Sequence, residues 1–212
     1  METNVSTVIV VTGASRGIGK AIALSLAAPD TALIINCSKS AGRLELVKEE
    51  IIKKGALCET FVGDVSNYST VNEMFDLAIS IYGKVNVLIN NAGIASIGLF
   101  QDMTPDMWNN IMSVNLNSVY NCCHFAVQDM LRRHCGKIIN ISSVWGLYGA
   151  SCEVAYSATK GAINSFTKAL AKELAPSNIQ VNAIACGAID TEMNGHLSPE
   201  ELQELAEEIP CG

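Results

Sequence analysis

A short apolar run that leads straight into a glycine-rich turn is the feature that most restricts how this chain can fold. Residues Val8–Val11 are β-branched, and the next eight residues, 12–19, read Thr-Gly-Ala-Ser-Arg-Gly-Ile-Gly. Glycines at such a place permit a tight turn and a close approach of backbone to a pyrophosphate, which the N-terminus of the following helix attracts. The spacing is Gly-x-x-x-Gly-x-Gly rather than Gly-x-Gly-x-x-Gly, and glycines also serve ordinary turns. The turn alone therefore leaves nucleotide binding open.

Short apolar runs alternate with longer helical patterns along the rest of the chain. We expect strands at residues 7–11, 32–35, 59–62, 85–89, 137–141 and 179–184, and helices at 18–27, 43–54, 71–81, 106–133, 155–175 and 202–208. Strands that alternate with helices build a parallel sheet covered on both faces. The 212 residues contain no linker, repeat or low-complexity segment. We expect one doubly wound, Rossmann-like α/β domain over residues 1–212.

Composition excludes several other classes of protein. Apolar residues make up 49% of the chain and charged residues 17%, which is typical of a globular protein. The net charge of −7 argues against a general nucleic-acid binder. No run is long enough to span a membrane and the first residues lack a signal-peptide pattern, so we expect a cytoplasmic location and no membrane partner. Eight cysteines and three histidines show no metal-ligand spacing, so we expect reduced cysteines in the interior and no metal site.

The end of the second expected strand bears on the choice of coenzyme. An acidic residue there would bind the ribose 2′-hydroxyl of NAD and repel a 2′-phosphate. The chain instead reads Asn-Cys-Ser-Lys over residues 36–39, and Arg16 in the glycine turn supplies a second positive charge. Both cations could be ordinary surface residues, but the absence of a carboxylate favours NADP.

A tyrosine and a lysine four positions apart, Tyr156 and Lys160, share one face of the expected helix at 155–175. A free tyrosine titrates near about 10, and a lysine ammonium beside it is expected to lower that pKa toward neutral. Ser143 lies thirteen residues before Tyr156 at the end of a strand, where its hydroxyl can hold a substrate carbonyl oxygen. Such a pair also arises by chance on amphipathic helices, so only its combination with the glycine turn indicates an oxidoreductase.

Across essentially its whole length the sequence resembles the classical short-chain dehydrogenases/reductases. The likeness rests on the glycine turn, Asp64-Val65, the Asn-Asn-Ala-Gly run at 90–93, Asn115 in a Val-Asn-Leu context, Ser143, and the Tyr-Ser-Ala-Thr-Lys run at 156–160. By this resemblance Tyr156 is the general acid in reduction and Lys160 also binds the nicotinamide ribose. Asn115 would hold a proton-relay water near Lys160, and Asp64 would contact the adenine. The resemblance implies a cofactor groove formed by Gly13, Ser15, Arg16, Gly17, Ile18, Gly19, Ser38, Lys39, Asp64, Val65, Asn90, Asn91, Ala92, Gly93, Tyr156, Lys160, Gly187, Ile189 and Thr191.

Within that family the likeness is greatest to bacterial 3-oxoacyl-(acyl-carrier-protein) reductases. It rests on residues 12–19, 138–144, 187–193 and 208–210, which other family reductases share in part. The implied activity is NADPH-dependent reduction of a 3-oxoacyl thioester, free or bound to acyl carrier protein, to the 3-hydroxyacyl thioester in fatty-acid biosynthesis. Two alternatives stay open: a dehydrogenase of a sugar, steroid or other secondary alcohol, and an inactive nucleotide-binding fragment.

Three departures from the family pattern qualify these expectations. Cys186 stands where the family usually has proline. Two basic positions are expected to dock acyl carrier protein; Arg132 and Arg133 approximate the first, and Ser177 stands at the second. The family also continues into a further helix and a seventh strand, so we expect a chain that is incomplete at its C-terminus and leaves a sheet edge exposed. Intact members associate as homotetramers, which is the expected assembly.

Overall fold

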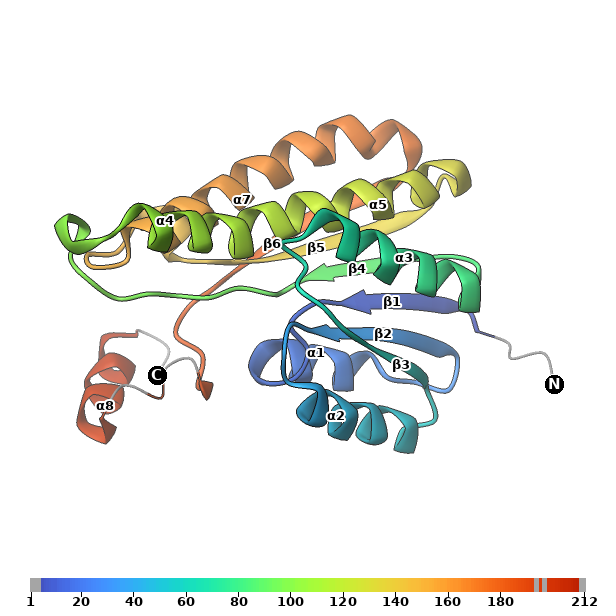
Figure 1. The fold of residues 1–212 in the computed structure, drawn as a ribbon, viewed down its shortest axis with the longest axis horizontal. Helices are drawn as coiled ribbons and strands as arrows, with labels where there is room; N and C mark the ends of the chain where they lie inside the picture. Colours follow the sequence, from blue (N-terminus) through green and yellow to red (C-terminus); the bar gives the residue numbers. More distant parts are fainter. Residues whose placement is uncertain (1–4, 193–194, 196–197, 210–212) are drawn as a thin grey trace.

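The computed structural model describes residues 5–192, 195 and 198–209. Its parallel strands form one sheet in the order β3-β2-β1-β4-β5-β6, with helices on both faces (Figure 1). The strands are β1 (Thr7–Val11), β2 (Thr31–Cys37), β3 (Leu57–Val62), β4 (Val87–Asn90), β5 (Gly136–Ser143) and β6 (Ile179–Cys186). The helices are α1 (Gly17–Leu26), α2 (Ala41–Lys53), α3 (Tyr68–Tyr82), α4 (Pro105–Met112), α5 (Ser118–Arg133), α6 (Trp145–Tyr148), α7 (Val154–Leu174) and α8 (Pro199–Glu208). The predicted Rossmann-like fold is confirmed.

Two apolar clusters hold the helices against the sheet. Helices α3, α5 and α7 pack on one face through a cluster that includes Met74, Met130 and Ile163. Helices α1 and α2 cover the other face through a second cluster that includes Ala23 and Leu44. Because successive strand residues point to opposite faces, a strand covered on both sides is apolar along most of its length, and any polar residue in it needs a hydrogen-bond partner. All seven residues of β2 are buried accordingly.

The strand order determines where a ligand can bind. β1 lies between β2 and β4, so the order of the strands reverses at this point. In open α/β sheets, ligands bind in the crevice beyond the carboxyl ends of the strands at such a reversal. The glycine turn follows β1, the Asn-Asn-Ala-Gly segment follows β4, and Ser143 ends β5. Segments far apart in the sequence therefore meet at one edge of the sheet.

Two elements differ from the sequence-based expectation. The helix expected over 106–133 is divided, because the π-helical segment η2 (Ser113–Asn117) separates α4 from α5. Helix α6 was not expected, since four residues are too few to show a helical period. Short 3₁₀ turns, η1 (Phe100–Asp102) and η3 (Ala175–Ser177), precede α4 and follow α7. The remaining elements form where the sequence predicts them, with ends that differ by a few residues.

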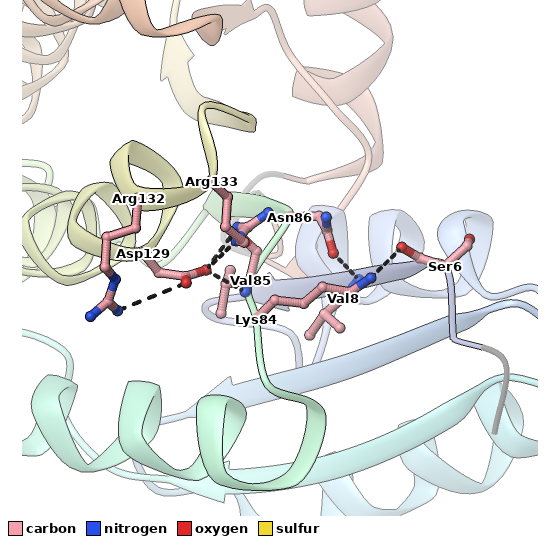
Figure 2. Close-up of polar contacts among 8 residues, drawn as sticks. All are labelled: Ser6, Val8, Lys84, Val85, Asn86, Asp129, Arg132 and Arg133. Carbon is pink, nitrogen blue, oxygen red and sulfur yellow. Dashed lines mark hydrogen bonds and ion pairs between the residues drawn. The ribbon is translucent and has the colours of Figure 1, made fainter. Parts of the chain in front are cut away.

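A largely buried ion pair fastens the end of α5 to the chain just before β4 (Figure 2). Asp129 Oδ2 accepts hydrogen bonds from the Val85 amide at 3.0 Å and from Arg133 Nε at 2.9 Å. Arg133 also donates to the Val85 carbonyl. The Arg133 side chain is 26% exposed, whereas that of Arg132 is 72% exposed and reaches Asp129 Oδ1 only at 3.8 Å. The two adjacent arginines thus have different surroundings.

Strand β6 forms one edge of the described sheet, opposite β3, and pairs only with β5. Its residues 182–185 are exposed, in contrast to the buried central strands. A groove of about 330 Å³ lies between β6 and α7, lined by residues that include Ala171, Val181 and Ala183. Within the part of the chain that the structure describes, no helix combines the length and apolarity needed to cross a bilayer.

Candidate active site

The glycine turn between β1 and α1 has no room for side chains at two positions. Gly13 has φ +64°, and a Cβ there would lie 2.9 Å from the Cα of Ala92. A Cβ at Gly19 would overlap the Gly13 carbonyl oxygen. Asn91 Nδ2 donates to the carbonyls of Thr12 and Gly13, each at 3.0 Å, and so fastens the turn to the segment after β4. The result is a backbone cradle at the N-terminus of α1 that suits a diphosphate.

Two arginines and one carboxylate meet at the N-termini of α1 and α2. Arg16 precedes α1 and Arg43 lies in the first turn of α2. Both donate through Nη1 to Oε2 of Glu192, at 3.2 and 2.8 Å. These contacts hold the pKa of Glu192 below its usual value, and the hydrogen bond from Arg43 contributes most. Ser38 and Lys39 are exposed nearby at the end of β2.

The predicted adenine side of the groove follows β3. Asp64 is exposed, and its Oδ1 accepts a hydrogen bond from the Ser66 amide at 2.9 Å, which shapes the loop. Val65 is 5% exposed and belongs to the apolar cluster on the α3 face. Asn121 of α5 donates to the Val65 carbonyl at 3.1 Å. Of the pair, Asp64 alone presents its side chain to solvent.

The two asparagines at the end of β4, Asn90 and Asn91, have different hydrogen-bond partners. Asn90 is 4% exposed; its Nδ2 donates to Asn140 Oδ1 at 2.8 Å and approaches Cys123 Sγ at 3.3 Å. Its side chain therefore lies in the interior on the α5 and α7 face, so only its backbone is available to the expected groove. The reason is strand alternation, since Ile89 packs on the opposite face. Asn91 is directed to the glycine turn instead.

Ser143, Tyr156 and Lys160 converge where β5 ends and α7 begins. The Ser143 side chain hydrogen-bonds to Tyr156. Lys160 Nζ lies 5.5 Å from the centre of the Tyr156 ring and donates to the Ile141 carbonyl at 2.7 Å. Ser142 Oγ donates to the Lys160 carbonyl at 3.2 Å, which helps to position α7 on the sheet. The three predicted catalytic side chains are thus brought together.

Burial is the largest influence on the pKa values of Tyr156 and Lys160. It raises the pKa of Tyr156 above its usual value, and the hydrogen bond from Ser143 opposes the rise only in part. It lowers the pKa of Lys160 to about 8. The expected shift of the Tyr156 pKa toward neutral is therefore not found, because desolvation of the phenol outweighs the contributions that lower its pKa. The lysine ammonium is held on the Ile141 carbonyl.

Asn115 lies in η2, is fully buried, and holds the loop after β4. Its Oδ1 accepts from the Ile94 amide at 2.8 Å, and its Nδ2 donates to the Ile94 carbonyl at 2.9 Å. Nδ2 also contacts Thr159 Oγ1 at 3.2 Å. A Cβ on Gly93 would lie 3.4 Å from Asn115 Oδ1 and 3.7 Å from Lys160 Nζ. Asn115, Gly93 and Lys160 are therefore neighbours; the relay water stays a prediction.

The segment after β6 reaches back to the glycine turn. Cys186 pairs with Ser143 in the sheet, and its carbonyl accepts from the Val144 amide at 2.9 Å. Burial raises the pKa of the Cys186 thiol, and Lys160 opposes that rise. Thr191 lies against Gly17, since a Cβ there would be 3.6 Å from the Thr191 Cβ. Gly187 and Ile189 are exposed beyond the end of β6.

The remaining predicted positions belong to the turn itself. Ser15 is half-buried, Ile18 packs against the apolar cluster beneath α1, and the Ala92 amide donates to Thr12 Oγ1 at 3.0 Å. Sequence reasoning missed Arg43 and Glu192. Glu192 lies 149 residues from Arg43 and 176 from Arg16, so no local pattern links them. The sequence offers one signal for Arg43: it is a positive charge a few residues after the second strand, in a segment that has no acidic residue at the strand end.

Within the described ranges, no three His, Cys, Asp or Glu side chains are grouped to hold a metal ion. The seven described cysteines are free. Four of them are buried, as expected for reduced cysteines, but Cys135 is exposed and Cys152 and Cys186 are half-buried. The expectation that all lie in the interior is therefore wrong for these three, and Cys211 lies outside the described residues.

Comparison with known proteins gives consistent matches. The family model described as short chain dehydrogenase matches residues 7–202. The 3-oxoacyl-(acyl-carrier-protein) reductase of Staphylococcus epidermidis is 39% identical over 200 residues, covering 94% of this chain and 82% of that protein. The enzyme of the same name from Aquifex aeolicus is 39% identical over 206 residues, covering 97% and 83%.

Two solved structures are also similar. A Sinorhizobium meliloti protein provisionally named a short-chain alcohol dehydrogenase superposes with a TM-score of 0.91 at 32% identity, covering 97% of this chain and 82% of that chain. An NAD⁺-bound xylitol dehydrogenase superposes with a TM-score of 0.82 at 32% identity, covering 88% and 72%.

Proposed function

This chain belongs to the short-chain dehydrogenase family, and we propose that it is an NADPH-dependent reductase of 3-oxoacyl thioesters. The observation that carries the proposal is the convergence of Ser143, Tyr156 and Lys160 at the sheet edge that also bears the glycine turn. The substrate class is supported by 39% identity to a curated 3-oxoacyl-(acyl-carrier-protein) reductase over 94% of the chain.

The residues at the sheet edge fit a nicotinamide dinucleotide. A Cβ at Gly13 or Gly19 would clash with Ala92, with Asn91 or with the Gly13 carbonyl, so only glycine permits this tight turn, and a turn of this kind binds a diphosphate in dinucleotide-binding folds. A preference for NADP is supported by the absence of an acidic residue over 36–44 and by the positive charges of Arg16 and Lys39. When bound, the nicotinamide supplies the hydride. The other groove residues named from the sequence remain proposed contacts, Asn90 through its backbone alone.

The chain's own residues would position the ketone and move one proton. Ser143 Oγ holds the ketone oxygen beside the Tyr156 hydroxyl, and Tyr156 gives its proton to that oxygen as the carbonyl carbon receives the hydride. The C=O group becomes CH–OH, and the phenolate is reprotonated from solvent through the proposed water held by Asn115. Because its pKa is raised, Tyr156 holds its proton at neutral pH, and a change that brought this pKa nearer neutral would make the proton transfer more efficient. The Lys160 ammonium stabilises the phenolate that forms.

For substrate carried on acyl carrier protein, we propose Arg132 as the docking residue. Its side chain is 72% exposed, whereas Arg133 is bound to Asp129 and the Val85 carbonyl. Ser177 provides no charge at the second position that the resemblance implies. We also propose a cytoplasmic homotetramer, for which light scattering should give four times the mass of one chain.

A second candidate is a dehydrogenase of a polyol or another secondary alcohol. The similarity to an NAD⁺-bound xylitol dehydrogenase favours it, because the same catalytic residues can act in either direction on such substrates.

The test is a spectrophotometric assay of NADPH and NADH oxidation with acetoacetyl thioesters, a ketose and a cyclic ketone. We expect the thioester with NADPH to give the largest kcat/KM. Tyr156→Phe should reduce kcat by roughly 10²–10⁴-fold with the cofactor still bound, whereas Tyr82→Phe, at the far end of α3, should change little. A larger kcat/KM for the ketose would favour the second candidate, and an active Tyr156→Phe variant would overturn the proton donor.

A further inference from the structure

Two arginines at the N-termini of α1 and α2 form an anion site, and a carboxylate of the chain itself occupies it. Neither helix has an acidic residue in its first turn, and neither N-cap side chain accepts a backbone hydrogen bond. The first N–H groups of both helices therefore lack the usual acidic or capping partner. Arg16 and Arg43 add two guanidinium groups to these helix ends. An anion is favoured at such a place.

The anion present is the carboxylate of Glu192, from the segment after β6. A single oxygen, Oε2, accepts from Arg43 Nη1 at 2.8 Å and from Arg16 Nη1 at 3.2 Å. Thr191, the preceding residue, lies against Gly17 in the glycine turn. Lys39, the other cation named from the sequence, is exposed and forms no ion pair with any residue of the described ranges.

We propose that Arg43, together with Arg16, binds the 2′-phosphate of NADPH, and that Glu192 competes with this phosphate for the two arginines. The inference rests on the proposed NADPH preference and deepens it, because it assigns Arg43 and Glu192 to cofactor selection. A phosphate carries more charge than a carboxylate and more acceptor oxygens, so it can displace Glu192 from both guanidinium groups. All three side chains are more than half exposed, so the internal ion pairs are weak enough to be exchanged.

If Glu192 competes with the phosphate, substitutions of Glu192 and of Arg43 should change the affinity for such ligands in opposite directions. Removing the Glu192 charge should strengthen binding of ligands that carry a 2′-phosphate, because the arginines are then always available. Removing the Arg43 charge should weaken binding of the same ligands. Neither change should affect ligands without the 2′-phosphate. A carboxylate that merely held the loop in place would give loss on removal, not gain.

The experiment is calorimetric titration of NADPH, NADH, adenosine 2′-monophosphate and adenosine 5′-monophosphate into the wild type, Glu192→Gln, Arg43→Gln and the double variant. For Glu192→Gln we expect NADPH and the 2′-monophosphate to bind about 2- to 10-fold more tightly. For Arg43→Gln we expect them to bind about 10-fold more weakly. NADH and the 5′-monophosphate should change by less than about twofold. In the double variant the gain from Glu192→Gln should shrink, because only Arg16 then remains in competition.

Matched controls separate local from general charge effects. Glu73→Gln removes an exposed carboxylate from α3, and Lys53→Gln removes an exposed cation from the other end of α2; both should leave all four titrations unchanged. Weaker NADPH binding by Glu192→Gln, or equal losses for NADPH and NADH in Arg43→Gln, would overturn the inference. A wild type that binds NADH as tightly as NADPH would instead refute the cofactor preference on which the inference rests.

Discussion

At the scale of single residues, burial of the Lys160 ammonium costs the folded state stability. Lys160 is 4% exposed, and burial lowers its pKa to about 8. An unfolded lysine titrates near about 10.4, so below pH 8 both states hold the proton and the folded state bears the full cost of a buried ammonium, roughly 3 kcal/mol. Between about pH 8 and 10 the folded chain releases a proton that the unfolded chain keeps, so this cost disappears as the pH rises.

Lys160→Met should therefore stabilise the protein while abolishing turnover. At pH 7 we expect a gain of about 1–3 kcal/mol in the free energy of unfolding, because about 1 kcal/mol is lost with the hydrogen bond to Ile141. The gain should decrease toward zero near pH 10. Urea unfolding of wild type and variant from pH 7 to 10 measures it, with Lys168→Met, an exposed lysine of the same helix, as the control. A variant less stable than wild type at pH 7 would contradict this account of the site.

At the scale of elements, the last turn of α5 combines a structural and an exposed arginine in adjacent positions. Arg133 closes a contact among α5, Asp129 and the chain before β4 (Figure 2). Arg132 reaches Asp129 Oδ1 only at 3.8 Å and has most of its side chain in solvent. Removing one partner of a buried ion pair leaves the other charge unpaired, whereas exposed ion pairs contribute little.

Arg133→Ala should lower the free energy of unfolding by about 2–3 kcal/mol. Arg132→Ala should change it by less than about 0.5 kcal/mol. For activity we expect the larger effect from Arg132→Ala. This substitution should raise the KM for a thioester carried on acyl carrier protein several-fold, but it should not raise the KM for the same thioester on a small carrier. Unfolding curves and steady-state kinetics of the two variants provide the comparison. Equal stability of both would show that the Asp129 contact contributes nothing.

At the scale of the whole molecule, the sheet is unevenly covered. Strands β3 and β6 each pair on one side only, but β3 packs against α2, whereas β6 has exposed residues on both of its faces. Ile184 is 51% exposed within this strand, next to unpaired backbone groups. An apolar, unpaired strand edge is a template for association with another chain.

Ile184→Lys should therefore reduce concentration-dependent association, because a charge on an edge strand discourages pairing. Ile52→Lys on α2 is the matched control, since Ile52 is 49% exposed on a helix whose backbone is already paired. Light scattering over a range of protein concentrations should show a smaller weight-average mass for the first variant and no change for the second. Equal behaviour of both would mean that the β6 edge does not mediate association.

The sequence by itself determined the fold and which side chains form most of the proposed catalytic set. Apolar runs alternating with helical patterns are local signals, and a strand buried on both faces is mostly apolar, so the parallel sheet could be predicted. The glycine turn and the Ser143, Tyr156 and Lys160 spacing are local in the same sense, because each pattern lies within one turn, one helix or one strand end. The structure places them together at the sheet edge.

Only the tertiary structure decided what the packed surroundings do to these side chains. Whether Tyr156 titrates above or below its usual pKa depends on how many neighbours exclude water, which no spacing encodes. The inward direction of Asn90 and the hydrogen bonds that join Asp129 and Arg133 to Val85 depend on residues brought close by the sheet and by α5. The same holds for Glu192, whose arginine partners are 149 and 176 residues away in sequence. Sequence patterns indicate which side chains lie at the site. Burial and long-range contacts determine the charge of these side chains and their hydrogen-bond partners.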